Sequence, residues 1–321
     1  MVKRLLLLLL SLVAACGKFD DPAIVLDLRP LAMAADVPEQ VVTVDLNQQP
    51  TADQILAQLV DAHISVLIAD PNFTRGIRWS AELCNLTNAE RCDHANPYID
   101  LGSGEWMDPE FNPPPVITVP ANGNLLGVLL DELQNDTLHG LGGLAYGVSL
   151  RIGGDGADPD LDQYAAKSLM VSPDIPVGRV PNQNPTIDHI DATVNYKVAP
   201  VMMPLPQGRC TLGDAALQVG AGTLLKLEPA ETTATRETYS VPTIDGMTRT
   251  FTEAVTYQWI ATGGKFSDAT TGGGHDAFGN LMSLITVWTA PKEAGRYSLW
   301  TIVRDERLGV TWYEACIEVT K

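Results

Sequence analysis

The sequence predicts an all-β protein with two tandem β-sandwich domains, and three observations lead to this prediction. The 321 residues include 27 glycines and 22 prolines, which are typical of short strands joined by tight turns. Many segments alternate apolar and polar residues with the period of a strand that buries one face. These segments recur in a similar order in both halves of the chain, whose length suits two domains of roughly 150 residues.

The composition also limits the partners of the protein. Apolar residues make up 45% and charged residues 19% of the chain, a balance that argues against general disorder. Acidic residues outnumber basic ones by 39 to 21, which gives a net charge of -18. Such a surface repels phosphate backbones, so nucleic acid is not an expected partner.

Residues 1–15 have the composition of a signal peptide. Lys3 and Arg4 form a basic start, and a mostly apolar run follows from residue 5 to residue 13. The run is too short to span a hydrocarbon core of about 30 Å, but it has the length of the apolar region of a signal peptide. An exported protein is therefore expected.

The residues Val13-Ala14-Ala15-Cys16 resemble the lipobox of bacterial lipoproteins. This resemblance implies that residues 1–15 are removed and that Cys16 carries lipid, palmitate included, which anchors the chain stably in a membrane. Gly17 stands where an aspartate would hold many Gram-negative lipoproteins at the inner membrane. The outer membrane is therefore expected, on its periplasmic or cell-surface face. The alternative is an ordinary secretory signal that happens to end near a cysteine.

Besides Cys16, the chain contains Cys84, Cys92, Cys210 and Cys316. An even number of cysteines in an exported protein indicates disulfides. The pairing within each half is favoured, because Cys84 and Cys92 are close neighbours and the other two both lie in the second half. No C-x-x-C motif occurs and the histidines are scattered singly, so neither zinc nor any cofactor is expected.

The expected elements of the first half follow in order along the chain. Leucines at helical spacing predict one short helix over 125–133, with Asn122 or Asn124 as its N-cap. A turn around Pro71 and Asn72 is expected to join the second predicted strand to the third. The strands are predicted at 24–29, 64–69, 77–81, 116–119, 146–152 and 165–171.

The second half follows a similar plan, and its last two strands are expected to form a hairpin. Tyr257-Gln258-Trp259-Ile260-Ala261 resembles Ile77-Arg78-Trp79-Ser80-Ala81 of the first half. About seven short strands with such a tryptophan predict an immunoglobulin-like sandwich for each half. The strands are predicted at 223–227, 255–261, 285–291, 296–303 and 311–319.

The domain boundaries follow from these elements. After the signal peptide, residues 16–23 form a lipidated tether and residues 24–172 form the first immunoglobulin-like domain, with the short helix inserted in it. Residues 173–186 contain several prolines and are expected to be a semi-rigid linker. Residues 187–321 form the second immunoglobulin-like domain.

Four further stretches carry a resemblance to a known group of proteins. They are residues 26–39, Tyr257-Gln258-Trp259, Trp288-Thr289-Ala290-Pro291 and residues 295–305. Together with the lipobox they resemble tandem immunoglobulin-like surface or outer-membrane lipoproteins of the myxobacterial type. The resemblance implies an envelope location and no known activity.

Motifs of catalysis or phosphate binding do not occur in the sequence. It contains no G-x-S-x-G, P-loop or H-E-x-x-H motif, and its five histidines are isolated, so no enzyme is predicted. The acidic loop with Asp155, Asp158, Asp160 and Asp162 is a weak calcium candidate, because closely spaced carboxylates suit that ion. The residue order of an EF-hand is absent, which favours a solvated turn.

Trp300 and Trp312 form the candidate ligand surface. Strand alternation places both on the outer face of the terminal hairpin, together with Cys316. Exposed indoles would form a stacking platform for sugar rings. The favoured alternative is that another part of the same chain covers them.

The expected cover is the stretch 197–213. A bond between Cys210 and Cys316 would pin this stretch to the outer face. Its apolar side chains would then reach the two indoles and exclude water from them. The side chains expected to do so are Met202, Met203 and Leu205.

These observations predict a non-enzymatic cell-envelope lipoprotein with a structural or a binding and adhesion role. Its expected contacts are the membrane, through the lipid anchor, and a protein or polysaccharide of the envelope. One alternative is a polysaccharide- or protein-binding module that uses exposed aromatics. A hydrolase without a recognisable motif is the remaining alternative.

Overall fold

The structure is a computed structural model that describes the greater part of the chain. The signal peptide and Cys16, with its predicted lipid, lie outside the described residues. Within the described residues, no helix is long and apolar enough to cross a membrane. The described ranges are 21–44, 51–71, 75–86, 90–109, 112–194, 197–204, 210, 217–243, 247–275 and 278–321.

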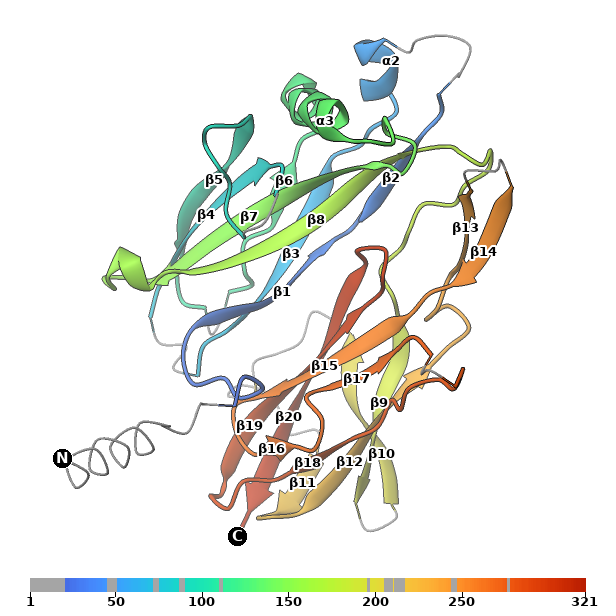
Figure 1. Cartoon of the computed structure of the whole chain (residues 1–321). Coiled ribbons are helices and arrows are strands. Elements are labelled where there is room, and N and C mark those ends of the chain that lie inside the picture. The colour runs from blue at the N-terminus through green and yellow to red at the C-terminus, as the bar shows by residue number, and fades with distance from the viewer. Residues whose placement is uncertain are drawn as a thin grey trace, which may run out of the picture.

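The first half of the chain folds into two facing sheets (Figure 1). One sheet has the order β1 (Arg29–Ala35), β3 (Ala62–Ala69) and β6 (Ile117–Val119). The other sheet has the order β2 (Glu39–Val42), β8 (Gln163–Pro173), β7 (Leu144–Gly154), β4 (Ile77–Cys84) and β5 (Tyr98–Trp106). All neighbours are antiparallel except β2 and β8.

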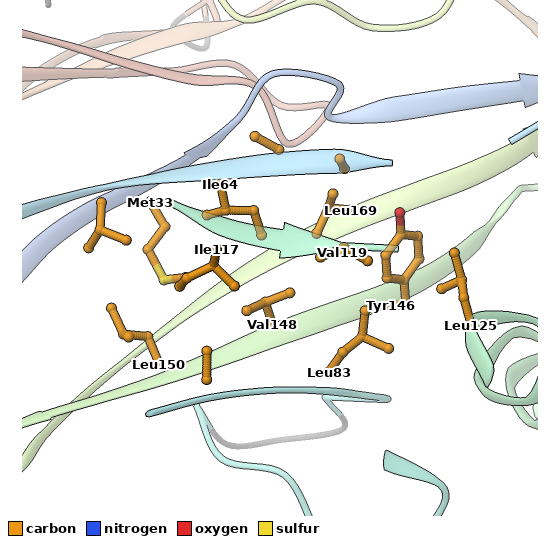
Figure 2. Packing of buried hydrophobic residues seen from close by; sticks show 14 of the residues in the cluster. Met33, Ile64, Leu83, Ile117, Val119, Leu125, Tyr146, Val148, Leu150 and Leu169 are labelled. Atoms are coloured by element: carbon orange, nitrogen blue, oxygen red, sulfur yellow. The ribbon is translucent and has the colours of Figure 1, made fainter. Parts of the chain in front are cut away.

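The core of this first sandwich is mainly aliphatic. Figure 2 shows Ile64 and Ile117 of one sheet facing Val148 and Leu150 of the other. Leu125 reaches the same core from helix α3 (Gly123–Asn135). Burial of these alternating residues on both inner faces is the main source of stability for such a sandwich.

The second half forms a second two-layered sandwich around a more aromatic core. Tyr257, Trp259, Trp288 and Tyr313 are buried between its layers. The strands follow the order β16 (Lys265–Phe266), β18 (Thr286–Thr289), β12 (Leu224–Glu231), β9 (Ile187–Val194), β10 (Lys197–Pro204), β20 (Val310–Thr320), β19 (Gly295–Arg304), β15 (Val255–Ala261) and β17 (Thr270–Gly273). The short β11 (Leu217–Gly220) pairs parallel with β20.

Two strands stand apart from both sandwiches. β13 (Thr238–Pro242) and β14 (Thr248–Thr252) form an antiparallel hairpin that pairs with no other described strand. Figure 1 shows this hairpin projecting from the second sandwich.

The prediction of an all-β protein with two tandem sandwiches is confirmed. The predicted helix is α3, and the Asn122 side chain accepts hydrogen bonds from the amides of Asn124 and Leu125 at 2.9 and 3.3 Å. A second, five-residue helix, α2 (Ala52–Leu56), was not predicted. Its signal is the capping box formed by Thr51 and Gln54.

One local prediction is wrong. Residues 24–28 do not form a strand, because β1 begins only at Arg29. The strands predicted on either side of Pro71 are β3 and β4, and the chain between them passes from one sheet to the opposite one. Alternation predicts that a segment is extended but does not show which strand it pairs with.

Candidate functional site

Trp300 and Trp312 lie on the outer face of the second sandwich, as predicted. In the β19–β20 register, Trp300 pairs with Glu314 and Trp312 with Ile302, so the two indoles are diagonal neighbours. Each tryptophan is only 2% exposed. A sugar ring therefore has no access to them, and the interpretation as a stacking platform is wrong.

The first sandwich covers these tryptophans. Leu31 and Ala32 of β1 and Leu67 and Ala69 of β3 belong to the same buried apolar cluster as the indoles. We call this cluster the apolar face of the joint between the two sandwiches. Its remaining buried members are Val25, Ile260, Ile302 and Val310.

The cover is thus a different part of the chain from the predicted stretch 197–213. Met203 and Pro204 of β10 pair with Glu314 and Tyr313 at the edge of β20. A strand that extends a sheet at its edge does not also lie across the face of that sheet. The side chains of Met202 and Met203 are not described, and Leu205 lies outside the described residues.

Both predicted disulfides are present in the structure. Cys84 and Cys92 close a short loop with a Cα–Cα distance of 5.7 Å, and Cys210 and Cys316 are linked with a Cα–Cα distance of 4.8 Å. Cys316 lies on β20 opposite Ser298. The second bond therefore joins Cys210 to the terminal hairpin on the same side of the strand as Trp312.

A cluster of buried charges lies at the joint beside the apolar face. Glu39 of β2, whose side chain is 2% exposed, pairs with Arg179 and Arg307, each at 2.6 Å. The Ser172 hydroxyl and the Asn182 amide donate to the same carboxylate at 2.6 and 2.7 Å. We call these groups, together with Glu253, the ionic cluster.

The environment of each carboxylate decides its ionisation. Burial alone would raise the pKa of Glu39, but its hydrogen bonds and the two guanidinium groups outweigh burial and hold this pKa below its ordinary value. Burial and the nearby Asp305 instead raise the pKa of Glu253 to about 7. The Arg307 guanidinium lies 3.4 Å from Glu253 and offsets only part of this effect.

Hydrogen bonds to the backbone complete the joint. The Asn184 side chain donates to the carbonyl of Ala35 at 2.6 Å and accepts from the amide of Val310 at 2.9 Å. Lys167 of β8 donates to the Leu308 carbonyl, and burial lowers the pKa of this lysine to about 8. Residues of the predicted linker are therefore held between the two sandwiches.

The N-terminal segment crosses the joint as well. Ala23 is buried in the core of the second sandwich. The amide of Val25 donates to the carbonyl of Ala261 at 2.8 Å, and the amide of Ala261 donates to the carbonyl of Ala23 at 2.9 Å. The end of the predicted tether and the start of the predicted first domain thus pack on the second sandwich.

The acidic loop contains a structural ion pair. Asp162 is buried and bridges Arg78 and Arg151, and the Arg151 Nε–Oδ2 distance is 2.7 Å. Asp158 caps a short 3-10 helix, η1 (Pro159–Leu161), by accepting from the Asp160 amide at 3.0 Å. The amide of Asp155 donates to the carbonyl of Gly76. No group of potential metal ligands occurs among the described residues, and Asp162 is already neutralised by arginine.

A cleft of about 340 Å³ lies between the N-terminal segment and the β7–β8 connection. Arg75 in its wall pairs with Asp70 at 2.9 Å and with Asp27 at 2.5 Å. Exposed Leu26 and Leu161 lie at the same cleft. Arg75 is thus neutralised by two carboxylates, an arrangement that supports the fold at this end of the first sandwich.

Comparison with known proteins supplies no family. No family model and no curated protein matches the chain. Domains 4 and 5 of the S-layer protein SbsC are 10% identical, with coverage of 91% of this chain and 100% of that chain and a TM-score of 0.18. The adhesin InvE of Yersinia pseudotuberculosis is 11% identical, with coverage of 90% and 58% and a TM-score of 0.19. Similarities this low carry no argument about fold or function.

Proposed function

We propose that the protein is a non-enzymatic lipoprotein of the cell envelope with a structural or binding role. Its two sandwiches act as a single rigid body, and the observation that carries this proposal is the joint between them. The apolar face and the ionic cluster bury residues of both sandwiches and of the segment that links them. A joint of this kind holds surfaces on the two sandwiches at a fixed spacing.

The proposed location is the outer membrane, with Cys16 as the lipidated residue. The lipobox and Gly17 support this location. Asp21, the first described residue, is five positions from Cys16. Five residues span at most about 18 Å, so the proposed tether holds the described part of the chain close to the membrane. The resemblance to myxobacterial surface lipoproteins also supports the proposed envelope location.

Two matched variants test the anchoring. We expect Cys16→Ala to remain unprocessed or to leave the membrane fraction, because no thiol is present to accept lipid. We expect Gly17→Asp to remain lipidated but to move to the inner membrane. Membrane fractionation and a shift in gel mobility report both outcomes. Unchanged processing and fractionation of Cys16→Ala would contradict the proposal.

A second experiment tests the rigid joint. Two spin labels or fluorophores, one at exposed Leu138 of the first sandwich and one at exposed Met282 of the second, report the distance between the sandwiches. We expect one narrow distance distribution. A broad distribution would show that the sandwiches move independently and would contradict the proposed rigid body.

A further inference from the structure

The hairpin of β13 and β14 presents a strand edge with no described partner. Most of β13 is half-buried, whereas all five residues of β14 are exposed. An isolated two-stranded hairpin is only marginally stable in water and gains stability when further strands are added. β14 is therefore an accessible edge to which a strand can be added.

The hydrogen-bond phase of the hairpin shows which groups face outward. The amide of Thr243 donates to the carbonyl of Met247 at 2.8 Å, and the amide of Glu253 donates to the carbonyl of Glu237 at 2.9 Å. Hydrogen-bonded pairs alternate with non-hydrogen-bonded pairs along an antiparallel ladder. The pairs Val241–Arg249 and Tyr239–Phe251 are therefore the hydrogen-bonded pairs within the hairpin.

By this phase, Arg249 and Phe251 of β14 direct their backbone groups toward β13. The N–H and C=O groups of Thr248, Thr250 and Thr252 consequently point to the free edge. These three residues can form a ladder with another strand without any change in the hairpin.

Arg249 is the one charged residue of this edge, which otherwise lacks the devices that usually prevent pairing. Natural edge strands carry charges, prolines or bulges that discourage association. The edge strand β5 carries Asp100 and Glu105, and its register with β4 is shifted between Ala81 and Glu82. β14 has the sequence Thr-Arg-Thr-Phe-Thr and pairs with β13 without a register shift.

We propose that β14 pairs antiparallel with β14 of a second copy of this chain about a two-fold axis at Thr250. In this register Thr250 lies opposite Thr250 of the second copy, and Thr248 lies opposite Thr252 of the second copy. Both are hydrogen-bonded pairs. Arg249 lies opposite Phe251 of the second copy as a non-hydrogen-bonded pair, with the Cα atoms about 4.5 Å apart. The edge is complementary to itself, because each guanidinium meets an aromatic ring.

The aromatic contacts of the hairpin favour this register. The Arg307 guanidinium lies 4.7 Å from the centre of the Tyr239 ring, and the rings of Tyr239 and Phe251 are stacked with centres 5.8 Å apart. Arg249 of the second copy would extend this series on the same face of the sheet. The strand contains no acidic residue, so it avoids local repulsion between chains of net charge -18.

One short strand pair forms a small interface. Interfaces that bury less than about 1,200 Å² belong mostly to weak complexes. We therefore expect little dimer in dilute solution and more where copies are concentrated on one surface. The assay must accordingly trap the contact covalently in cells that produce the full-length protein.

Thr250→Cys and Thr252→Cys form a matched pair for this assay. Residue 250 would lie about 5.5 Å from its copy between Cα atoms, within the range of a disulfide. Residue 252 would lie four positions from its copy, about 14 Å along the strand, and could not be bridged. After mild oxidation, a non-reducing gel should show a dimer for Thr250→Cys and a monomer for Thr252→Cys.

Two further variants in the Thr250→Cys background test the Arg–Phe register. Phe251→Arg places arginine opposite arginine, and we expect the cross-linked fraction to fall at least several-fold. The exchange Arg249→Phe with Phe251→Arg restores opposite partners and should restore the cross-link. Equal cross-linking at 250 and 252, no cross-link at either position, or no recovery by the exchange would overturn the proposal.

Discussion

At the joint, the apolar face around Trp300 and Trp312 lies beside the ionic cluster around Glu39 and Arg307. Burial of the apolar face stabilises the joint in proportion to the area removed from water, and it tolerates small changes in shape. The charges of the ionic cluster have lost their hydration, so they are stable only while every partner is in place. We therefore expect the apolar face to supply most of the stability and the ionic cluster to fix the relative orientation.

The largest effect is expected from truncation in the apolar face. Trp312→Ala should lower the free energy of unfolding by roughly 3–5 kcal/mol, because it leaves a cavity between the sandwiches. Denaturant unfolding measures this loss. The control is Trp312→Phe, which keeps an aromatic ring and removes an indole N–H that is buried without a described hydrogen-bond partner. We expect this control to cost less than about 1.5 kcal/mol. Equal losses for both variants would show that the cavity is not the cause.

In the ionic cluster, Glu39→Gln should lower the free energy of unfolding, measured with denaturant, by about 3 kcal/mol. Arg179 and Arg307 are then left buried beside a neutral group. The matched control is Glu228→Gln, which breaks a surface pair with Lys226 whose two side chains are 41% and 46% exposed. That variant should cost about 0–1 kcal/mol. Equal losses of unfolding free energy for Glu39→Gln and Glu228→Gln would show that the ionic cluster stabilises the joint no more than a surface ion pair does.

The two carboxylates of the cluster should respond to pH in different windows. The pKa of Glu253 is raised to about 7 in the folded protein, so the folded state holds this proton more tightly than the unfolded state. Stability should therefore fall as pH rises from the ordinary glutamate pKa to about 7, by up to about 3 kcal/mol in total. Glu253→Gln should remove this slope. Glu39, whose pKa is lowered, should lose its contribution only at more acidic pH.

The smallest effect is expected away from the joint, in the acidic loop. Asp160→Asn should change the free energy of unfolding by less than about 0.5 kcal/mol, because this position lies on the surface. Millimolar calcium should leave the Tm unchanged, since Arg78 and Arg151 already neutralise Asp162. A calcium-dependent rise in Tm that Asp160→Asn abolishes would contradict this assignment.

Period-two alternation predicted which faces of β19 and β20 point outward, and it placed Trp300 and Trp312 together. It did not predict their cover, because alternation shows that a face is buried without showing what buries it. Leu31 and Leu67 come from strands more than 200 residues earlier in the chain than these tryptophans. Such a contact depends on how two finished sandwiches dock.

The ionic cluster was not predicted at all. Glu39 begins a short strand of sequence Glu-Gln-Val-Val, and Arg179 and Asn182 stand in a proline-rich stretch typical of an exposed linker. Each residue has an ordinary surface interpretation when taken alone. Only the tertiary structure brings them together. A weak signal was available in Asn182 and Asn184, which are amide side chains set between Pro181 and Pro185.

The pairing of residues 23–25 with Ala261 has a mechanical consequence. A pull applied at Asp21 reaches the second sandwich first, through backbone hydrogen bonds to the end of β15. The first sandwich lies beside this load path and bears tension only after those bonds have broken. In a protein tethered at its N-terminus, a load applied to the second sandwich would thus pass to the tether while the first sandwich stays unstressed.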